Sequence, residues 1–155
     1  MTQLSIIPCG RKKIWDIDET VGNAPVKNVY LSRFHRLCRG YAELFTDDWV
    51  VLSAKHGFMF PDDVVDGPYD VTFNQKSNEI ISIEALRDQV DRKSLNRYDQ
   101  LVILTGKKYE PIINTCFENN KMVFPLKGYK GIGYMQQALK GSIETKQPLH
   151  SRKDR

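Results

Sequence analysis

The chain has 155 residues, 41% of them hydrophobic, and a formal net charge of +4. This length can bury one sizeable core, so we expect a single domain over residues 1–141. No apolar run approaches the roughly 18 to 20 residues that a membrane helix needs, and residues 1–4 show no signal-peptide pattern, so the sequence predicts a cytoplasmic protein without a membrane span.

The basic charge is concentrated at the C-terminus. Lys140 to Arg155 contains five basic and two acidic residues, which gives this segment +3 and leaves +1 for residues 1–139. Residues 142–155 are polar and have no apolar face, so we expect a disordered tail. The alternative is a basic arm that contacts phosphate groups.

The cysteine pattern excludes two classes of small-domain scaffold. Cys9, Cys38 and Cys116 are odd in number, far apart and without a Cys-x-x-Cys pair. This argues against a disulfide framework and against a structural zinc site. We therefore expect reduced thiols, no metal and no cofactor.

The N-terminal third predicts a strand, a long loop and a helix. Leu4–Ile7 is the strand, and the following turn leads into three consecutive cations. Residues 14–30 show no helical periodicity, which favours a functional loop or lid. Ser32 is a suitable N-cap for an amphipathic helix ending near Phe45, with Cys38 and Tyr41 in the core and His35 on the solvated side.

The middle of the chain centres on the stretch WVVLSAKHGFMFPDD. Trp49–Leu52 is short, apolar and β-branched, which predicts a strand buried on both faces. We expect a loop from residue 57 to Asp70, in which Phe58 to Phe60 either cap the sheet edge or form an aromatic wall for a flat ligand. A second helix is expected within residues 78–93.

The C-terminal third repeats the alternation of strand and helix. Gln100–Leu104 and Met122–Phe124 are the third and fourth strands, with a helix from Pro111 between them and a last helix from Tyr134 to Lys140, closed by Gly141. Strands joined through helices are parallel. We therefore predict a three-layer α/β/α fold with a four-stranded, mainly parallel sheet.

Glycine and lysine follow every predicted strand. In a parallel sheet the residues that directly follow the strands, here called the strand exits, share one edge, where α/β proteins bind ligands. We expect an anionic ligand there; the alternative is that the glycines serve turns and the lysines serve solubility. Neither a P-loop nor a Gly-x-Gly-x-x-Gly motif is present, so ATP and NAD have no motif. The candidate ligand-binding residues are Cys9, Gly10, Arg11, Lys12, Ser53, Lys55, Tyr69, Gly106, Lys108, Lys127, Gly131 and Gly133.

Six segments together resemble a known family. IPCGRKK, APVKNVYLSRF, LSAKHGFMFPDD, PYD, LTGKKY and PLKGYKGIGYMQQAL, spread over residues 4 to about 140, resemble a bacterial and phage domain of unknown function. More distantly, the chain is similar to the small α/β domain of archaeosine-type tRNA-guanine transglycosylases and to the uracil-DNA glycosylase fold. The resemblance implies a nucleotide, nucleobase or nucleic acid as the partner, and modified bases as targets.

Cleavage of an N-glycosidic bond needs a carboxylate for the water or the sugar cation, and a proton donor for the departing base. Uracil-DNA glycosylases carry Gly-Gln-Asp-Pro-Tyr and His-Pro-Ser segments where this chain reads PCGRKK and PLKG, so both groups must come from elsewhere. The carboxylate candidates are Asp62, Asp63 and Asp70, with Asp16 in reserve. The donor candidates are His56, Tyr109 and Lys108.

Two further roles depend on these loops. A flipped base requires a stacking partner, for which Phe58 or Phe60 is suitable. Cys9 is either a nucleophile activated by nearby cations or a small turn residue. The sequence thus leaves two functions open, a glycosylase-like hydrolase or transferase and a binding module without turnover, and it does not indicate an oligomeric state.

Overall fold

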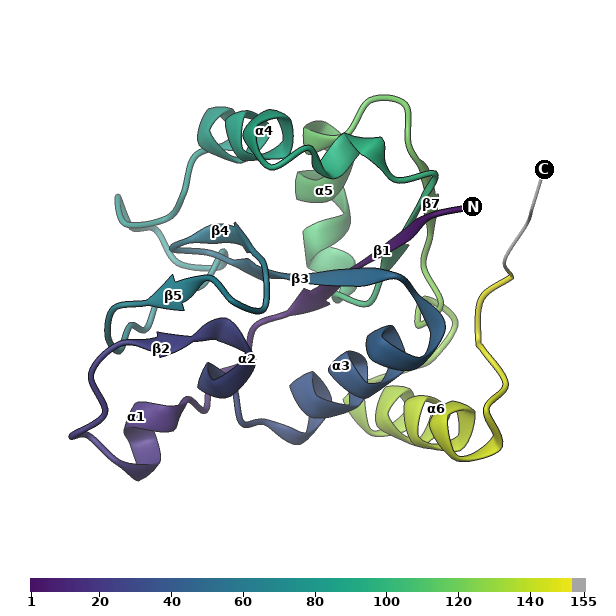
Figure 1. Ribbon diagram of the computed structural model, residues 1–155, viewed down its shortest axis with the longest axis horizontal. Coiled ribbons are helices and arrows are strands. Elements are labelled where there is room, and N and C mark those ends of the chain that lie inside the picture. The colour runs from purple at the N-terminus through teal and green to yellow at the C-terminus, as the bar shows by residue number, and fades with distance from the viewer. Residues whose placement is uncertain (152–155) are drawn as a thin grey trace.

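The computed structural model describes residues 1–151, built around a five-stranded sheet of order β4-β3-β1-β6-β7 (Figure 1). β1, β3, β6 and β7 are parallel, and β4 pairs antiparallel with β3. The mixed α/β fold with a mainly parallel sheet is therefore confirmed. The sheet strands are β1 (Gln3–Pro8), β3 (Asp48–Ser53), β4 (Gly57–Met59), β6 (Gln100–Ile103) and β7 (Lys121–Val123).

The predicted count of four strands is wrong because the chain reverses directly after β3. Gly57 has φ of +75°, a conformation that favours glycine, and it allows a tight hairpin. The residues after it, predicted as loop, then form β4, with Phe58 paired to Leu52 and Met59 to Val51. The next residues are consequently carried back toward the amino end of β3.

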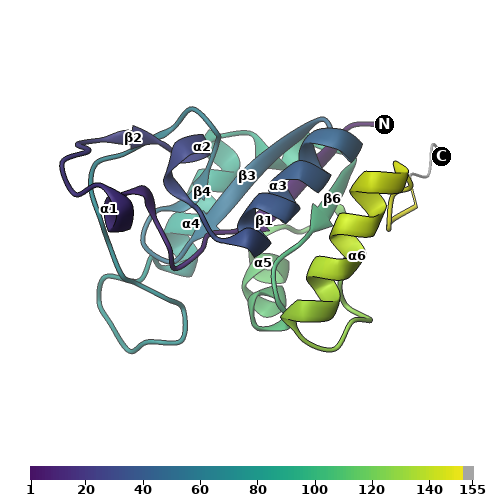
Figure 2. The ribbon, with the colours of Figure 1, turned by 90° about the horizontal axis from the view of Figure 1, so that it is seen from below.

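Helices cover both faces of the sheet (Figure 2). Alternate residues of each strand enter two separate cores, with Val51 and Val102 in one and Val50 and Leu101 in the other. Burial of each such side chain contributes about 1.5–3 kcal/mol. α3 (Arg33–Phe45) and α6 (Ile132–Thr145) pack on the first face, and α4 (Ile83–Arg92) and α5 (Glu110–Cys116) on the second. Two short 3-10 turns, η1 (Leu95–Arg97) and η2 (Lys107–Tyr109), precede β6 and α5.

The strand order places a switch point at the centre of the sheet. From β1 the chain passes through α3 to β3 on one side, and it later crosses to β6 and β7 on the other. The connections therefore diverge between the carboxyl ends of β1 and β6. In open α/β sheets this is where ligands bind.

Residues 14–30 are ordered structure, so the prediction of a long loop is wrong. They form α1 (Ile14–Ile17), β2 (Ala24–Pro25) and α2 (Val26–Val29), and β2 pairs with β5 (Val64–Val65). Val26 and Val29 are fully buried, and Trp15 Nε1 donates to the carbonyl oxygens of Val21 and Gly22 at 2.9 Å. These elements lie to the left in Figure 1, beyond the carboxyl ends of β1 and β3.

The α3 helix follows its prediction except at His35. Ser32 caps it, with Oγ accepting from the backbone N–H of His35 at 3.3 Å, and Cys38 and Tyr41 are fully buried. His35 is only 1% exposed, so its expected solvated position is wrong. The first turn of α3 packs against the exit of β1, and His35 Nδ1 donates to the carbonyl oxygen of Pro8 at 2.8 Å.

The C-terminal segment is also more structured than expected. α6 continues through Gly141 to Thr145, and His150 is 8% exposed. The Tyr41 hydroxyl accepts from the backbone N–H groups of Leu149 and His150 at 2.9 and 3.2 Å. The prediction of a disordered tail is therefore wrong for residues 142–151; residues 152–155 lie outside the described part.

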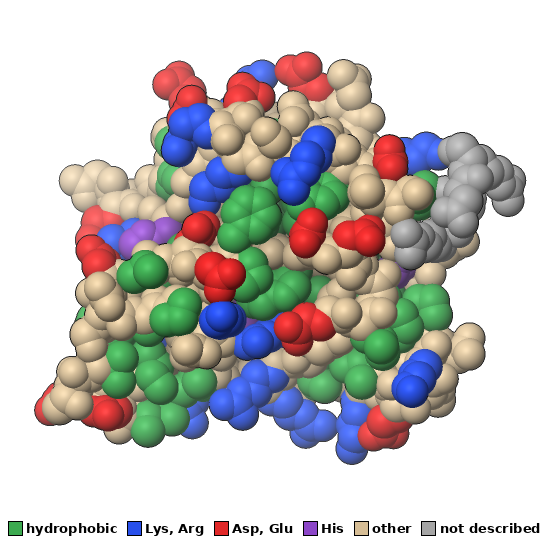
Figure 3. Space-filling model, in the orientation of Figure 1, with side chains coloured by type: hydrophobic (Ala, Val, Ile, Leu, Met, Phe, Trp, Pro, Cys, Tyr) green, Lys and Arg blue, Asp and Glu red, His purple; other side chains and the backbone are tan. Residues whose placement is uncertain are grey.

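Positive side chains form one row along an edge of the molecule. Figure 3 shows Lys and Arg side chains along the lower edge, in the region where Figure 1 draws α2 and α3. α3 carries Arg33, Arg36 and Arg39. Within residues 1–151, no helix combines the length and the apolar character that a membrane crossing requires.

Candidate functional site

The exits of three elements meet around the ring of Tyr69. Ser53, the last residue of β3, donates from Oγ to the Tyr69 hydroxyl at 2.9 Å, and the hydroxyl of Tyr30 is hydrogen-bonded to the same group. Tyr30 follows α2, and Tyr69 follows β5. The predicted ligand residues Ser53 and Tyr69 are therefore brought together, and they lie beyond the carboxyl edge of the sheet.

A buried cation lies against this ring. Lys13 is 7% exposed, and its Nζ is 4.6 Å from the Tyr69 ring centre. Nζ donates to the carbonyl oxygen of Arg11 at 3.2 Å, and Lys13 forms no ion pair with any of residues 1–151. The sequence favoured Arg11 and Lys12 as ligand residues, but both are exposed.

The turn after β3 adds a second cation and an imidazole. Ser53 Oγ accepts from the backbone N–H groups of Lys55 and His56 at 3.2 and 3.1 Å, which fixes the turn. Lys55 Nζ is 5.9 Å from the Tyr69 ring centre, and the His56 ring meets Tyr69 edge-on at 4.9 Å. Burial, and then Lys55, lowers the pKa of His56. A neutral imidazole has one accepting nitrogen, and His56 Nε2 is buried without a partner.

Cys9 and Tyr109 lie at the switch point, where they follow β1 and β6. Burial raises the pKa of Cys9 in spite of the opposing charges of Lys13 and Lys108. The thiol is therefore protonated at neutral pH, which favours a small turn residue over a nucleophile. Burial, followed by the neighbouring Cys9, raises the pKa of Tyr109 to about 12, so its neutral phenol can donate a hydrogen bond.

An aromatic surface is present, but it is not formed by the predicted residues Phe58 and Phe60. Phe73 and Tyr109 meet edge-on with ring centres 5.6 Å apart, and both are half-buried. Phe58 is fully buried against Phe117 and cannot stack on a ligand. Phe60 lies near Lys93, away from the exits. Phe73 was missed because a single aromatic residue in a polar loop gives no periodic signal.

The structure separates the predicted carboxylates. Asp62 pairs with Lys27 at 2.8 Å, and Asp63 Oδ2 accepts from the N–H of Phe60 at 2.8 Å and pairs with Lys93 at 3.1 Å. Since β4 runs back along β3 and ends with Met59 opposite Val51, neither carboxylate directly follows the carboxyl end of β3. Asp70 is exposed and adjacent to Tyr69, and Asp16 accepts from the backbone N–H of Lys13 at 2.8 Å.

A cavity of about 430 Å³ lies beside the exits of β6 and β7. Thr105, Glu110 and the predicted ligand residues Lys127 and Gly131 line it. Glu110, which the sequence did not indicate, has a side chain that is 20% exposed and pairs with Lys127 at 3.7 Å. The cavity therefore contains the carboxylate of Glu110, the residue that directly follows Tyr109 in the chain.

The glycines predicted to bind a ligand occupy positions that differ in whether the fold itself requires glycine. A Cβ on Gly10 would lie 2.7 Å from Ser32 Oγ, so packing against the start of α3 explains this residue. Gly131 has φ of +87°. A Cβ on Gly106 or Gly133 would meet no atom within 4 Å, so packing explains neither.

Among residues 1–151, no group of three or more His, Cys, Asp and Glu side chains could hold a metal ion. All three cysteines are free thiols, and Cys38 and Cys116 are buried in the two cores.

The buried His35 predicts a pH-dependent stability. Burial, followed by the charges of Arg39 and Arg36, lowers its pKa from 6.5 to about 4. Between pH 4 and 6.5 the unfolded chain therefore binds more protons than the folded protein. The free energy of unfolding keeps its full value above about pH 6.5 and falls by about 3 kcal/mol as the pH is lowered toward 4. We expect His35→Gln to reduce this acid sensitivity, measured by urea unfolding at several pH values. Parallel stability curves for the two proteins would contradict the assignment.

Comparison with known proteins gives two matches. The model of a family of unknown function, DUF6884, matches residues 5–141. An uncharacterized protein of Bacillus subtilis (strain 168), YfjM, is 48% identical over 150 residues, which cover 96% of this chain and 100% of that protein. No solved structure matches. The resemblance to a domain of unknown function is confirmed, and these matches give no support to the more distant resemblance to transglycosylases and uracil-DNA glycosylases.

Proposed function

Because the chain belongs to DUF6884, a family of unknown function, we propose its role from the site itself: it recognises a nucleotide at the carboxyl edge of the sheet, with the base between Lys13 and the aromatic pair Phe73 and Tyr109. The observation that carries the proposal is the side chain of Lys13, a lysine that is only 7% exposed. Its partners are one carbonyl oxygen and one aromatic face. Buried charges in proteins are normally paired.

The chemistry around Lys13 suits the edge of a base. An ammonium has three donors, and Arg11 accepts from one of them. The carbonyl oxygens and ring nitrogens of nucleobases accept such bonds. His56, with a buried and unpartnered Nε2, adds a group on the same side of the site. Hydrogen-bonding groups of this kind can read one edge of a base.

The aromatic pair supplies a surface for the face of the base. Phe73 and Tyr109 are half-buried at the mouth of the switch point, and Lys108 Nζ is 5.2 Å from the Tyr109 ring centre. Stacking of a base on an aromatic side chain contributes about 1–3 kcal/mol. The alternative, in which Phe73 and Tyr109 only close the second core, gives the buried residue Lys13 no role.

Recognition is better supported than hydrolysis. An N-glycosidase needs a carboxylate near the sugar, and Asp62 and Asp63 are engaged in ion pairs away from the exits. Asp70 and Glu110 remain near them, but Asp70 is exposed and Glu110 is paired with Lys127. We therefore propose binding without turnover and keep base release as the alternative.

Titration of nucleosides and nucleoside monophosphates, followed by NMR, tests this proposal. We expect saturable binding that shifts resonances at the exits of β1, β3 and β6, and about tenfold weaker binding by Phe73→Ala. Asn74→Ala is a control in the same loop, since Asn74 is exposed. Chromatography after incubation should recover intact ligand. Absence of saturable binding would refute recognition, and release of free base would establish the hydrolytic alternative.

A further inference from the structure

We propose that the cavity beside the exits of β6 and β7 binds the phosphate of the nucleotide. The ligand class would then be a nucleotide and not a free base or nucleoside. This inference rests on the proposed function, and it adds a second contact region on the opposite side of the switch point from Lys13. Four observations carry it.

The charge of the cavity is positive. Lys107, Lys127 and Lys130 line it together with one carboxylate, Glu110. Lys127 Nζ is 3.7 Å from Glu110 Oε2, so this carboxylate is partly neutralised, and the lining retains a net charge of +2. A phosphate group entering the cavity gains attraction from the two remaining cations.

The N-terminus of α6 borders the same cavity. Gly131 is its N-cap and lines the cavity, and no side chain caps the helix. The first backbone N–H groups of a helix have no partner inside the helix, and the helix dipole favours an anion there. By contrast, Ser32 and Ser82 cap α3 and α4 with their hydroxyl groups. α6 is therefore suited to an external acceptor.

An unsatisfied hydroxyl supplies independent evidence for a ligand. Thr105 follows β6 and lines the cavity, it is 7% exposed, and its Oγ1 is buried without a hydrogen-bond partner. Buried polar groups in proteins are nearly always hydrogen-bonded. Rotation of the Thr105 side chain toward the cavity would let this hydroxyl donate to a phosphate oxygen there.

Two glycines leave the backbone near the cavity open to a ligand. A Cβ on Gly128 or Gly133 would meet no atom within 4 Å, and neither residue has a positive φ. Gly133 is moreover inside the first turn of α6, where alanine is the better helix former. Glycine at such positions allows close approach of a ligand to the backbone.

Inorganic phosphate is the appropriate first probe. At constant ionic strength, we expect it to shift the amide resonances of residues 132–134 in a saturable manner. Thr105→Val and Gly133→Ala should each weaken phosphate binding about tenfold. Gly133→Ala should do so without lowering the melting temperature, which separates binding from folding. Lys140→Gln removes an exposed charge that pairs with Glu144 farther along α6, and it should leave binding within about twofold.

The outcomes separate this site from the proposed function. Unchanged phosphate binding in both variants, or equal weakening by Lys140→Gln, would overturn the phosphate site. If nucleosides bind as tightly as their monophosphates, recognition stands and the phosphate site is refuted. If phosphate binds at α6 and a nucleoside moiety adds no affinity, the phosphate site stands and nucleotide recognition fails.

Discussion

Gly57→Ala is expected to destabilise the protein by about 4 kcal/mol, because it combines backbone strain with the loss of two hydrogen bonds. Gly57 has φ of +75°, which costs an L-residue about 1–2 kcal/mol. Its added Cβ would overlap Gln89 Oε1. Gln89 would have to move, and urea unfolding at neutral pH measures the cost.

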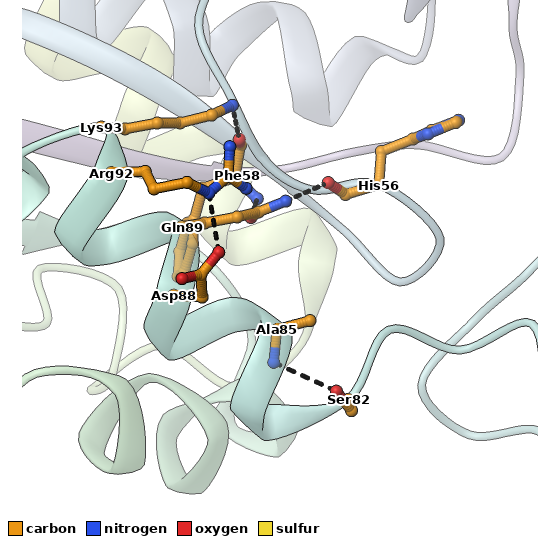
Figure 4. Close-up of polar contacts among 8 residues, drawn as sticks. All are labelled: His56, Phe58, Ser82, Ala85, Asp88, Gln89, Arg92 and Lys93. Carbon is orange, nitrogen blue, oxygen red and sulfur yellow. Dashed lines mark hydrogen bonds and ion pairs between the residues drawn. The ribbon is translucent and has the colours of Figure 1, made fainter.

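Gln89 is important because it holds the hairpin between β3 and β4 (Figure 4). Its Oε1 accepts from the N–H of Phe58 at 2.8 Å, and its Nε2 donates to the carbonyl oxygen of His56 at 2.9 Å. Displacement of Gln89 leaves these part-buried backbone groups without their partner. The same hairpin carries Lys55 and His56, so the effect should reach the candidate site.

A double-mutant cycle separates the two contributions. In a Gln89→Ala background the steric conflict is absent, so Gly57→Ala should cost only about 1–2 kcal/mol. Gly67→Ala is the matched control, since Gly67 has an ordinary φ and no atom within 4 Å of an added Cβ. Equal costs of Gly57→Ala in both backgrounds would show that Gln89 plays no part.

The alternation of apolar strands with amphipathic helices was sufficient to predict the core of the fold. Trp49–Leu52 and Leu101–Leu104 are apolar without interruption, which occurs where both faces of a strand are buried. Ser32 and Pro111 mark the starts of α3 and α5 through local capping chemistry, which depends on adjacent residues only. These features are local, and the chain displays them directly.

The errors arise where tertiary contacts decide the structure. β2 and β5 have two residues each, and their paired residues are 39 and 41 positions apart in the sequence, so neither strand has a recognisable pattern. His35 is buried by the exit of β1, which helical periodicity cannot show. Similarly, Tyr41 orders the C-terminal segment through its hydroxyl group.

The candidate site was predictable in location but only partly in residues. Parallel strands placed Ser53 and Tyr109 at one edge, as the sequence suggested, and the hydrogen bond from Ser53 brings Tyr69 to the same edge. The adjacent cations Arg11, Lys12 and Lys13 are alike in sequence, and only the fold determines which one is buried. The carboxylates of the loop were misplaced because β4 was not foreseen.

Lys13→Met should weaken nucleotide binding about 30- to 150-fold, corresponding to a loss of about 2–3 kcal/mol from hydrogen bonds to a charged group. Methionine has a similar length and can keep contact with the Tyr69 ring. The backbone N–H of Lys13 still donates to Asp16, so the local chain path is retained. Calorimetric titration with the monophosphate that binds best to the parent protein measures the effect.

The stability of the same variant provides the decisive second measurement. Replacing a buried charge by an apolar side chain of similar volume is often neutral or stabilising, so we expect the free energy of unfolding of Lys13→Met to match or exceed that of the parent. Lys140→Met makes the same change of charge at an exposed position and should bind normally. A Lys13→Met protein that binds like the parent but unfolds more easily would make this ammonium a structural group, and the buried cation would then give no support to ligand recognition at the switch point.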